Sequence, residues 1–300
     1  MMSSDLLNAM SVDVEDYFQV QAFFGQIDRK DWDGIEARVE RNTEKVMALF
    51  DRAGVKGTFF TLGWVAERYP ALIRRIVENG HELASHGMAH YRADEQEPEV
   101  FREDIRRAKA LLEDAGGAEV KGYRAATFSI GKKNMWAFDI LGEEGYQYSS
   151  SINPVKHDLY GMPDSPRFAY RPRGENGILE IPVTTVVRKG QNIPCGGGGY
   201  FRLFPYMLFR HNLRTMQKAD NQSANFYFHP WEVDPDQPKV PGISLKTRVR
   251  HYLNLGRMER RLERLMKDFR WGRMDEVYAD LLEKRPAPSA EPLQEAVPSR

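Results

Sequence analysis

Apolar residues follow two alternating patterns along the first half of the chain. Compact apolar and β-branched runs, which are typical of buried strands, cover residues 8–14, 56–63, 81–87 and 122–130. Between them lie segments with apolar residues every three or four positions, as in amphipathic helices; these are residues 35–54, 64–80 and 101–117. Strands that alternate with helices at this pitch predict βα units, and hence an α/β fold with a parallel sheet covered by helices.

The pattern changes after about residue 165. Residues 167–187 predict a β-hairpin followed by an extended run, and residues 195–205 predict a glycine-rich loop that leads into aromatic residues. A further strand ends at His229, and a basic helical segment covers residues 246–273. The last residues, 285–300, are rich in proline and polar residues, which is typical of disorder.

Composition excludes several classes of protein. Lys and Arg total 43, and Asp and Glu also total 43, so bulk charge gives no attraction to nucleic acid. The one cysteine, Cys195, excludes an internal disulfide framework and fits a reducing compartment. The first residues contain no basic start followed by an apolar run, and no apolar stretch reaches about 18 residues, so we expect neither a signal peptide nor a membrane span. The expectation is a soluble cytoplasmic protein.

Side chains capable of chemistry follow the predicted strands. An acidic run, residues 13–16, closes the first strand, and His86 and His90 follow the third. Arg124 and His229 also lie at predicted strand ends. Because α/β folds carry their chemistry at the carboxyl ends of parallel strands, we expect these side chains to share one site.

The acidic run is Asp13-Val14-Glu15-Asp16. A strand alternates its faces, so Asp13 and Glu15 are expected to project together, with Asp16 turning into the loop. Carboxylates this close repel one another unless a cation or an arginine offsets their charge. Taken alone, the run is explained equally well as a solvated acidic loop.

His86 and His90 stand four residues apart. Zinc commonly takes imidazole nitrogens plus one carboxylate and keeps a position for water when the site is catalytic. The histidine pair is weak evidence alone, but together with an acidic strand end it favours a metal site over chance. His81 is assigned to packing, and His229 is assigned to the site rather than to the core because of its place at a strand end.

Six motifs occur together in an order that resembles one known family. They are SVDVEDYF, TFFTLG, HELASHGMAH, GYRAATFSI, GGGGYFRLFPY and FYFHPWEVDPDQP, within roughly residues 8 to 275. The set resembles polysaccharide deacetylases of the NodB-homology type (carbohydrate esterase family 4), and more narrowly the exopolysaccharide-locus, XrtA/PEP-CTERM-associated subfamily with a C-terminal DUF3473-type region. The resemblance implies metal-dependent hydrolysis of acetyl groups on an exopolysaccharide or its precursor.

The resemblance also implies the architecture. It is a distorted (β/α) barrel with a C-terminal β-hairpin and a helical extension. We expect residues 1–165 to form the deacetylase core, residues 166–284 to complete the barrel and the groove with His229, and residues 285–300 to be a disordered tail.

The family motifs assign metal ligands to this chain. His86 and His90 match the two histidines of the metal motif, which implies a divalent cation, with zinc expected. The acidic run matches an aspartate motif that supplies a general base and a ligand. Families differ in the register of this motif. We expect Asp13 as the base and Asp16 as the ligand, with Glu15 able to take either role.

The remaining roles also follow from the resemblance. Arg124 matches the arginine that orients the base, and His229 matches the general acid. A backbone N–H near Thr127 is expected to bind the oxyanion. Trp231 and Tyr200 are candidates for stacking on sugar rings, whereas Phe201 is assigned to the core.

Two positions depart from the family pattern. Ala126 stands where relatives often have proline, and Ser149 stands where they commonly have aspartate. The second departure removes a carboxylate near the site. The sequence therefore leaves open an O-acetyl esterase or cyclic-amide hydrolase of the same fold, and also a glycan-binding pseudoenzyme.

The expected partner is an acetylated polysaccharide or oligosaccharide. The basic segment 246–273 is compatible with contact to an anionic membrane surface. A solvated helix face packed on the barrel is the favoured interpretation of that segment.

Overall fold

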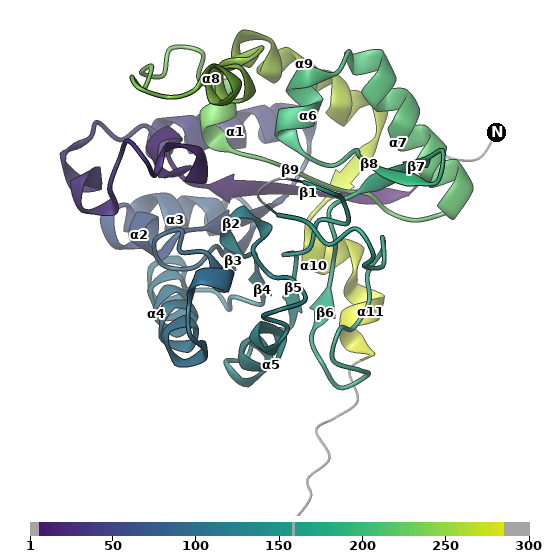
Figure 1. Cartoon of the computed structure of the whole chain (residues 1–300), viewed down its shortest axis with the longest axis horizontal. Coiled ribbons are helices and arrows are strands. Elements are labelled where there is room, and N and C mark those ends of the chain that lie inside the picture. Colours follow the sequence, from purple (N-terminus) through teal and green to yellow (C-terminus); the bar gives the residue numbers. More distant parts are fainter. Residues whose placement is uncertain (1–5, 158–159, 285–300) are drawn as a thin grey trace, which may run out of the picture.

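The computed structural model describes residues 6–157 and 160–284. Its main sheet has the strand order β10-β1-β2-β3-β4-β5-β6, and β9 also pairs with β1. All pairings between these strands are parallel. The strands are β1 (Leu7–Val14), β2 (Thr58–Thr61), β3 (Glu82–Ser85), β4 (Gly122–Tyr123), β5 (Tyr148–Ser149), β6 (Leu179–Glu180), β9 (Asn225–Phe228) and β10 (Arg270–Gly272). This curled parallel sheet with its helical cover confirms the predicted distorted (β/α) barrel (Figure 1).

Helices follow the first strands in turn. They are α1 (Val39–Ala53), α2 (Gly63–Arg68), α3 (Pro70–Glu78), α4 (Pro98–Gly116) and α5 (Trp136–Glu143). Their apolar positions are buried, as Leu72, Ile73 and Ile76 of α3 show. The single helix expected over residues 64–80 is two helices, because Pro70 has no N–H to continue α2 and instead begins α3.

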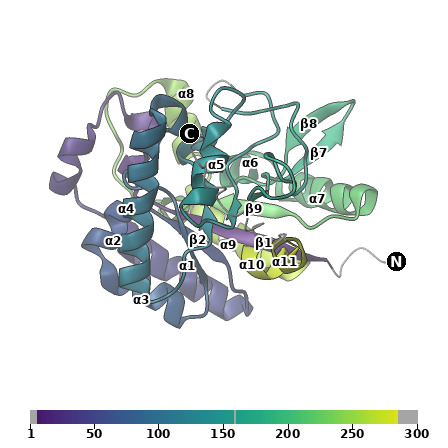
Figure 2. The ribbon, with the colours of Figure 1, turned by 90° about the horizontal axis from the view of Figure 1, so that it is seen from below.

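The second half of the chain also contributes a separate two-stranded sheet and the remaining α-helices of the described residues. The helices are α6 (Gly198–Leu203), α7 (Tyr206–Asp220), α8 (Leu245–Tyr252), α9 (Leu255–Asp268), α10 (Met274–Val277) and α11 (Ala279–Glu283). The hairpin β7 (Thr185–Arg188) and β8 (Gln191–Pro194) forms a separate sheet. Figure 2 shows this hairpin and α7 on the side of the molecule opposite α2, α3 and α4.

Two local expectations for the irregular segments were wrong, and a third was confirmed only in part. The strand expected over 122–130 stops at Tyr123, because the chain turns into a 3-10 helix at Ala126–Phe128. The glycine-rich segment expected as a loop forms α6. The hairpin expected within 167–187 is reduced to one antiparallel bridge, between Tyr170 and Glu180. The extended run expected after it includes β7, which forms a second hairpin with β8.

The remaining 3-10 helices lie at Tyr17–Gln19, Gln21–Phe23, Arg29–Gly34, Ala93–Glu95 and Pro230–Val233. His81 and Phe201 are buried in the core, as expected. Within the described residues, no helix combines the length and apolar character needed to cross a bilayer. The tail expected at 285–300 lies outside the described residues.

Candidate active site

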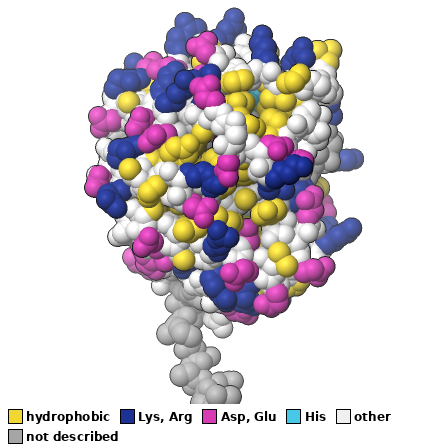
Figure 3. Space-filling view, turned by 90° about the vertical axis from the view of Figure 1, so that its left-hand side faces the viewer, with side chains coloured by type: hydrophobic (Ala, Val, Ile, Leu, Met, Phe, Trp, Pro, Cys, Tyr) yellow, Lys and Arg dark blue, Asp and Glu magenta, His cyan; other side chains and the backbone are white. Residues whose placement is uncertain are grey.

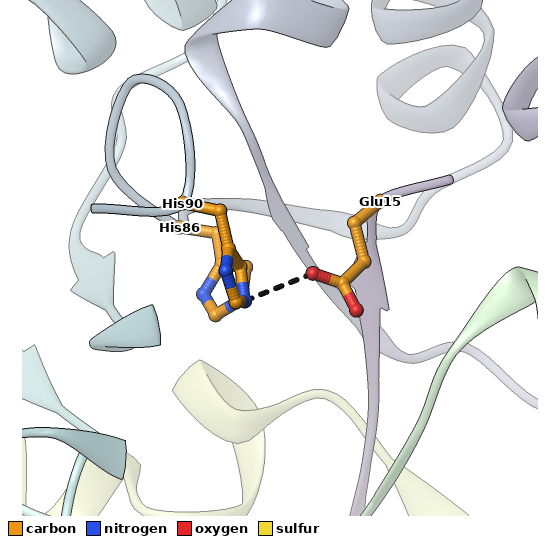
Figure 4. Close-up of side chains that lie close together, drawn as sticks. All are labelled: Glu15, His86 and His90. Carbon is orange, nitrogen blue, oxygen red and sulfur yellow. Dashed lines mark ion pairs between the residues drawn. The ribbon is translucent and has the colours of Figure 1, made fainter. Parts of the chain in front are cut away.

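Glu15, His86 and His90 form a buried cluster at the carboxyl ends of β1 and β3. One ligand atom from each lies within 4.8 Å of the others. Figure 4 shows both imidazoles turned toward the Glu15 carboxylate, and His90 Nε2 lies 3.0 Å from Glu15 Oε2. The sequence predicted that the two histidines would meet one carboxylate of the acidic run. The structure brings these three side chains together.

The loop after β3 fixes the two imidazoles. His86 Nδ1 lies 2.8 Å from the carbonyl oxygen of Arg124; a carbonyl only accepts, so Nδ1 carries the proton and Nε2 is left as a ligand atom. Gly87 has φ 75°, and a Cβ there would meet the Asp104 carboxylate at 2.9 Å. His90 itself has φ 54°, a left-handed conformation that non-glycine residues adopt rarely and mostly where the surrounding structure imposes it.

A divalent cation fits this cluster. Glu15 Oε2 is buried and accepts no hydrogen bond of good geometry, and His90 Nδ1 also has no hydrogen-bond partner. Burial lowers the pKa of His86 to about 4, so its imidazole is neutral, as a ligand must be. Burial raises the pKa of Glu15, but the facing imidazoles of His90, His229 and His86 outweigh it and lower that pKa to about 2. Two imidazoles and one carboxylate are a donor set that zinc commonly takes.

The structure does not bring Asp16, the expected ligand, into this cluster. Asp16 is the N-cap of the 3-10 helix at Tyr17, whose N–H donates to Oδ1 at 2.8 Å. The backbone N–H groups of Arg38 and Val39 donate to Oδ2 at 2.5 and 2.8 Å. Burial raises the pKa of Asp16 to about 6 against the effect of these bonds. Asp16 therefore joins β1 to the start of α1, and Glu15 is the carboxylate that lies beside the two histidines.

Asp13 and Arg124 form a fully buried ion pair beside the cluster. Arg124 Nη1 lies 2.5 Å from Asp13 Oδ1 and also donates to Ser11 Oγ at 2.9 Å. Ser150 accepts from the other guanidinium nitrogens through its carbonyl and hydroxyl oxygens. This framework holds Asp13 in one orientation, with its second oxygen 3.9 Å from His229 Nε2.

His229 follows β9, the strand that pairs with β1, and so reaches the same site. Its Nε2 lies 3.5 Å from Glu15 Oε1, and its Nδ1 lies 2.9 Å from Glu232 Oε1. Burial lowers the pKa of His229, but the hydrogen bond with Glu232 and the nearby charges of Glu15 and Asp13 outweigh it and raise the pKa to about 9. Trp231 stacks on the imidazole, with ring centroids 4.9 Å apart.

The sequence analysis missed Glu232 and Arg202. Arg202 Nε lies 2.6 Å from Glu232 Oε2, and both side chains are buried. Although burial raises the pKa of Glu232, the charge of Arg202 and the bond from His229 lower it to about 2. The HPWE spacing, an acid three residues after His229, was a usable signal for Glu232, whereas nothing in the sequence near Arg202 marked it.

One cavity of about 510 Å³ joins these groups. Asp13, Glu15, His86, His90 and His229 line it, together with Thr127 and Trp231. Thr127 lines this cavity and has φ 55°, a left-handed conformation that non-glycine residues adopt rarely. Tyr200 lines a neighbouring cavity instead.

The departures at Ala126 and Ser149 lie behind the site. Ser149 is fully buried, and its hydroxyl lies 2.7 Å from that of Ser151, which accepts from the Ala125 N–H. Neither Ala126 nor Ser149 lines the 510 Å³ cavity. The carboxylate that contacts His229 on the side away from the cluster comes from Glu232.

Comparisons with known proteins match two successive segments. Residues 32–148 match the family model described as polysaccharide deacetylase, and residues 150–279 match a domain of unknown function, DUF3473. The chain contains a polysaccharide deacetylase domain followed by a DUF3473 region. The metal-binding histidines expected from the sequence lie in the deacetylase domain, whereas His229, Glu232 and Arg202 come from the DUF3473 region.

Individual relatives agree with this domain but cover it only in part. The chain is 26% identical over 118 residues to the peptidoglycan deacetylase-like protein FGM2 of Gibberella zeae, covering 39% of this chain and 34% of that protein. It is 29% identical over 99 residues to a chitooligosaccharide deacetylase of a Bradyrhizobium strain, covering 33% of this chain and 43% of that protein. The matched part of the chain thus spans 34% and 43% of the length of these two curated relatives.

A solved structure agrees over nearly the whole chain. It is that of a Mycobacterium smegmatis protein of the polysaccharide deacetylase type, with a TM-score of 0.61 and 18% identity. The alignment covers 98% of this chain and 96% of that one. At this identity the likeness concerns the fold, including the second half of the chain.

Proposed function

We propose that the chain hydrolyses N-acetyl groups of a polysaccharide or oligosaccharide and releases acetate, with a divalent metal held by Glu15, His86 and His90. One observation carries this proposal. In a single cavity, a buried cluster of two histidines and one carboxylate lies beside both a fixed carboxylate, Asp13, and a histidine, His229. Hydrolysis of an amide needs a base for water, an acid for the leaving amine and positive charge at the oxyanion.

Each role has a residue in position. The cation, when bound, polarises the acetyl carbonyl and the attacking water. Asp13 accepts the proton of that water, and its ion pair with Arg124 holds the carboxylate in one orientation. A backbone N–H near Thr127, a residue that lines the cavity, is the proposed hydrogen-bond donor to the oxyanion.

His229 serves as the acid that protonates the leaving amine. Its Nε2 points into the cavity, since Nδ1 is bound to Glu232. Fixing the second ring nitrogen sets the orientation of the imidazole and stabilises its protonated form. Trp231 stacks on the same ring and closes one wall.

The proposed substrate is a glycan with acetamido sugars, as in an exopolysaccharide. The names of the matched relatives, a chitooligosaccharide deacetylase among them, concern acetamido glycans. Exopolysaccharide as the particular glycan rests on the sequence resemblance alone. The carboxylate lost at Ser149 does not favour the pseudoenzyme alternative, because Glu232 supplies a carboxylate to His229.

Acetate release tests the proposal. The wild-type protein with added zinc is expected to release acetate from N-acetylated chito-oligosaccharides in preference to O-acetylated xylan. His86→Ala is expected to abolish bound metal and acetate release with unchanged circular dichroism. Full acetate release by His86→Ala in the presence of a chelator contradicts the metal site, and release from acetylated xylan alone identifies an O-acetyl esterase.

A further inference from the structure

A second cavity of about 250 Å³ adjoins the catalytic cavity. His157, Tyr160, Tyr227 and Arg250 line both cavities, so the two lie side by side. The second cavity lies between α6 and α8, and its wall includes Tyr200, Leu203 and Val249. A ligand that places an acetamido sugar at the catalytic cluster can therefore extend along this groove.

The part of the second cavity that does not border the catalytic cavity includes exposed aliphatic side chains beside Tyr200. Leu203 is 51% exposed and Val249 is 48% exposed. Leu245, one helical turn before Val249, is 76% exposed. Grouped exposed aliphatic side chains mark binding sites for apolar partners, whereas sugar rings are recognised by aromatic faces and polar groups. In Figure 3, hydrophobic side chains lie around a hollow in which a histidine is visible.

Basic side chains lie between the sugar site and this apolar end. Lys246 lines the catalytic cavity, and Arg250 lines both cavities. Helix α8 carries three basic residues, Lys246, Arg248 and Arg250, and no acidic one. In Figure 3, Lys and Arg side chains run along the upper edge of the same face. The order along the groove is the catalytic cluster, then positive charge, then aliphatic surface.

We propose that the groove binds the aglycone of an amphiphilic substrate, in which the acetamido sugar is joined through a phosphate to an aliphatic chain. The polarity of such a molecule follows the same order as the groove: sugar, anion, hydrocarbon. This inference rests on the proposed function and adds a substrate class to it. It uses the groove between α6 and α8, which the hydrolytic machinery does not need.

Matched synthetic substrates test each part of the molecule. The probes are the methyl and octyl β-glycosides of N-acetylglucosamine and the octyl phosphodiester of the same sugar, all below micelle-forming concentrations. The kcat/KM for the octyl glycoside is expected to exceed that for the methyl glycoside by about tenfold or more, since burial of about two methylene groups corresponds to a factor of this size. The phosphodiester is expected to gain a further factor that falls as salt is raised.

Variants locate these gains on the structure. In Leu203→Ser and Val249→Ser, the ratio of octyl to methyl kcat/KM is expected to fall toward one; because the ratio is taken within each variant, partial misfolding cancels. Val187→Ser, exposed on β7, is the matched control and keeps the wild-type ratio. Lys246→Gln is expected to lose the phosphate gain, and Arg248→Gln, which lines neither cavity, to keep it.

Three results overturn the inference. The first is an octyl-to-methyl ratio of kcat/KM near one in the wild type, and the second is an unchanged ratio in Leu203→Ser and Val249→Ser. The third is a kcat/KM that rises with longer chito-oligosaccharides but not with the octyl chain, which marks the groove as sugar subsites. If no acetate is released from any substrate, the proposed function fails by itself. The affinities of the octyl and methyl glycosides for the Asp13→Asn protein are then measured by calorimetry. An octyl-to-methyl affinity ratio of about ten or more supports binding of the alkyl chain in the groove, and a ratio near one contradicts it.

Discussion

Glu232 Oε1 lies 2.9 Å from Nδ1 of His229, and its second oxygen lies 2.6 Å from Arg202 Nε. Arg202 is in turn bonded to the carbonyl oxygens of Arg250, His251 and Leu253. The orientation of the His229 imidazole therefore depends on a buried chain of contacts within the DUF3473 region.

Glu232→Gln is expected to reduce kcat at least tenfold and to lower stability by about 3–5 kcal/mol, because the change leaves Arg202 buried without its counter-charge. Acetate release and urea denaturation measure the two effects. Glu259→Gln is the matched control: its ion pairs with Lys45 and Arg52 are largely exposed, and less than about 1 kcal/mol is expected to be lost. Unchanged kcat in a folded Glu232→Gln protein contradicts the role of Glu232.

Asp13→Asn is expected to lower kcat by roughly 10²–10⁴-fold while bound metal is retained, since Asp13 is the proposed base and lies outside the group of Glu15, His86 and His90. Acetate release and metal content by mass spectrometry are measured on the same sample. Loss of metal together with activity assigns Asp13 to the cation instead.

Asp16→Asn and Glu15→Gln separate the two neighbouring carboxylates. Asp16 accepts hydrogen bonds from three backbone N–H groups, and the amide of asparagine would present its own N–H₂ to some of them. Asp16→Asn is therefore expected to lose about 1–3 kcal/mol of stability and to bind metal normally. Glu15→Gln is expected to lose metal affinity by at least tenfold with little change in stability. The opposite pattern restores Asp16 as the ligand.

Much of this site could be predicted because parallel strands end at one edge. The ends of β1, β3 and β9 gather residues from distant parts of the chain, and the alternation of a strand placed Asp13 and Glu15 on one face. The family pattern pointed instead to Asp16 as the ligand. Two of the groups that bond to Asp16, the N–H groups of Arg38 and Val39 at the start of α1, lie 22 and 23 residues further along the chain, and no local pattern reveals them.

Other features could not be derived from local patterns. The last two glycines before Tyr200, Gly198 and Gly199, begin α6. Gly198 lies so close to the Glu232 carboxylate that a Cβ would meet it at 2.2 Å. Packing against a residue far along the chain, and not loop flexibility, thus explains this glycine. The pairing of Arg202 with Glu232 likewise depends on tertiary contacts between α6 and the turn after β9.

Glu180 gives the protein a pH-dependent stability. Burial raises its pKa to about 7, although it accepts N–H bonds from Ser151 and Ile152. The folded state binds this proton more tightly than the unfolded state, so the stabilisation is full below about pH 4.5 and is lost as the pH rises through 7. Relative to the wild type, Glu180→Gln is expected to gain up to about 3 kcal/mol between pH 4.5 and 8. Urea denaturation of both proteins in chelator measures this, and a pH-independent difference contradicts it.

The proposed metal site at Glu15, His86 and His90 is tested most directly by anomalous diffraction from crystals soaked in zinc. One strong anomalous peak is expected at about 2.0–2.2 Å from a Glu15 oxygen and from one nitrogen each of His86 and His90. A peak bound by Asp16 or by residues elsewhere, or no peak beside the histidine pair at saturating zinc, contradicts it.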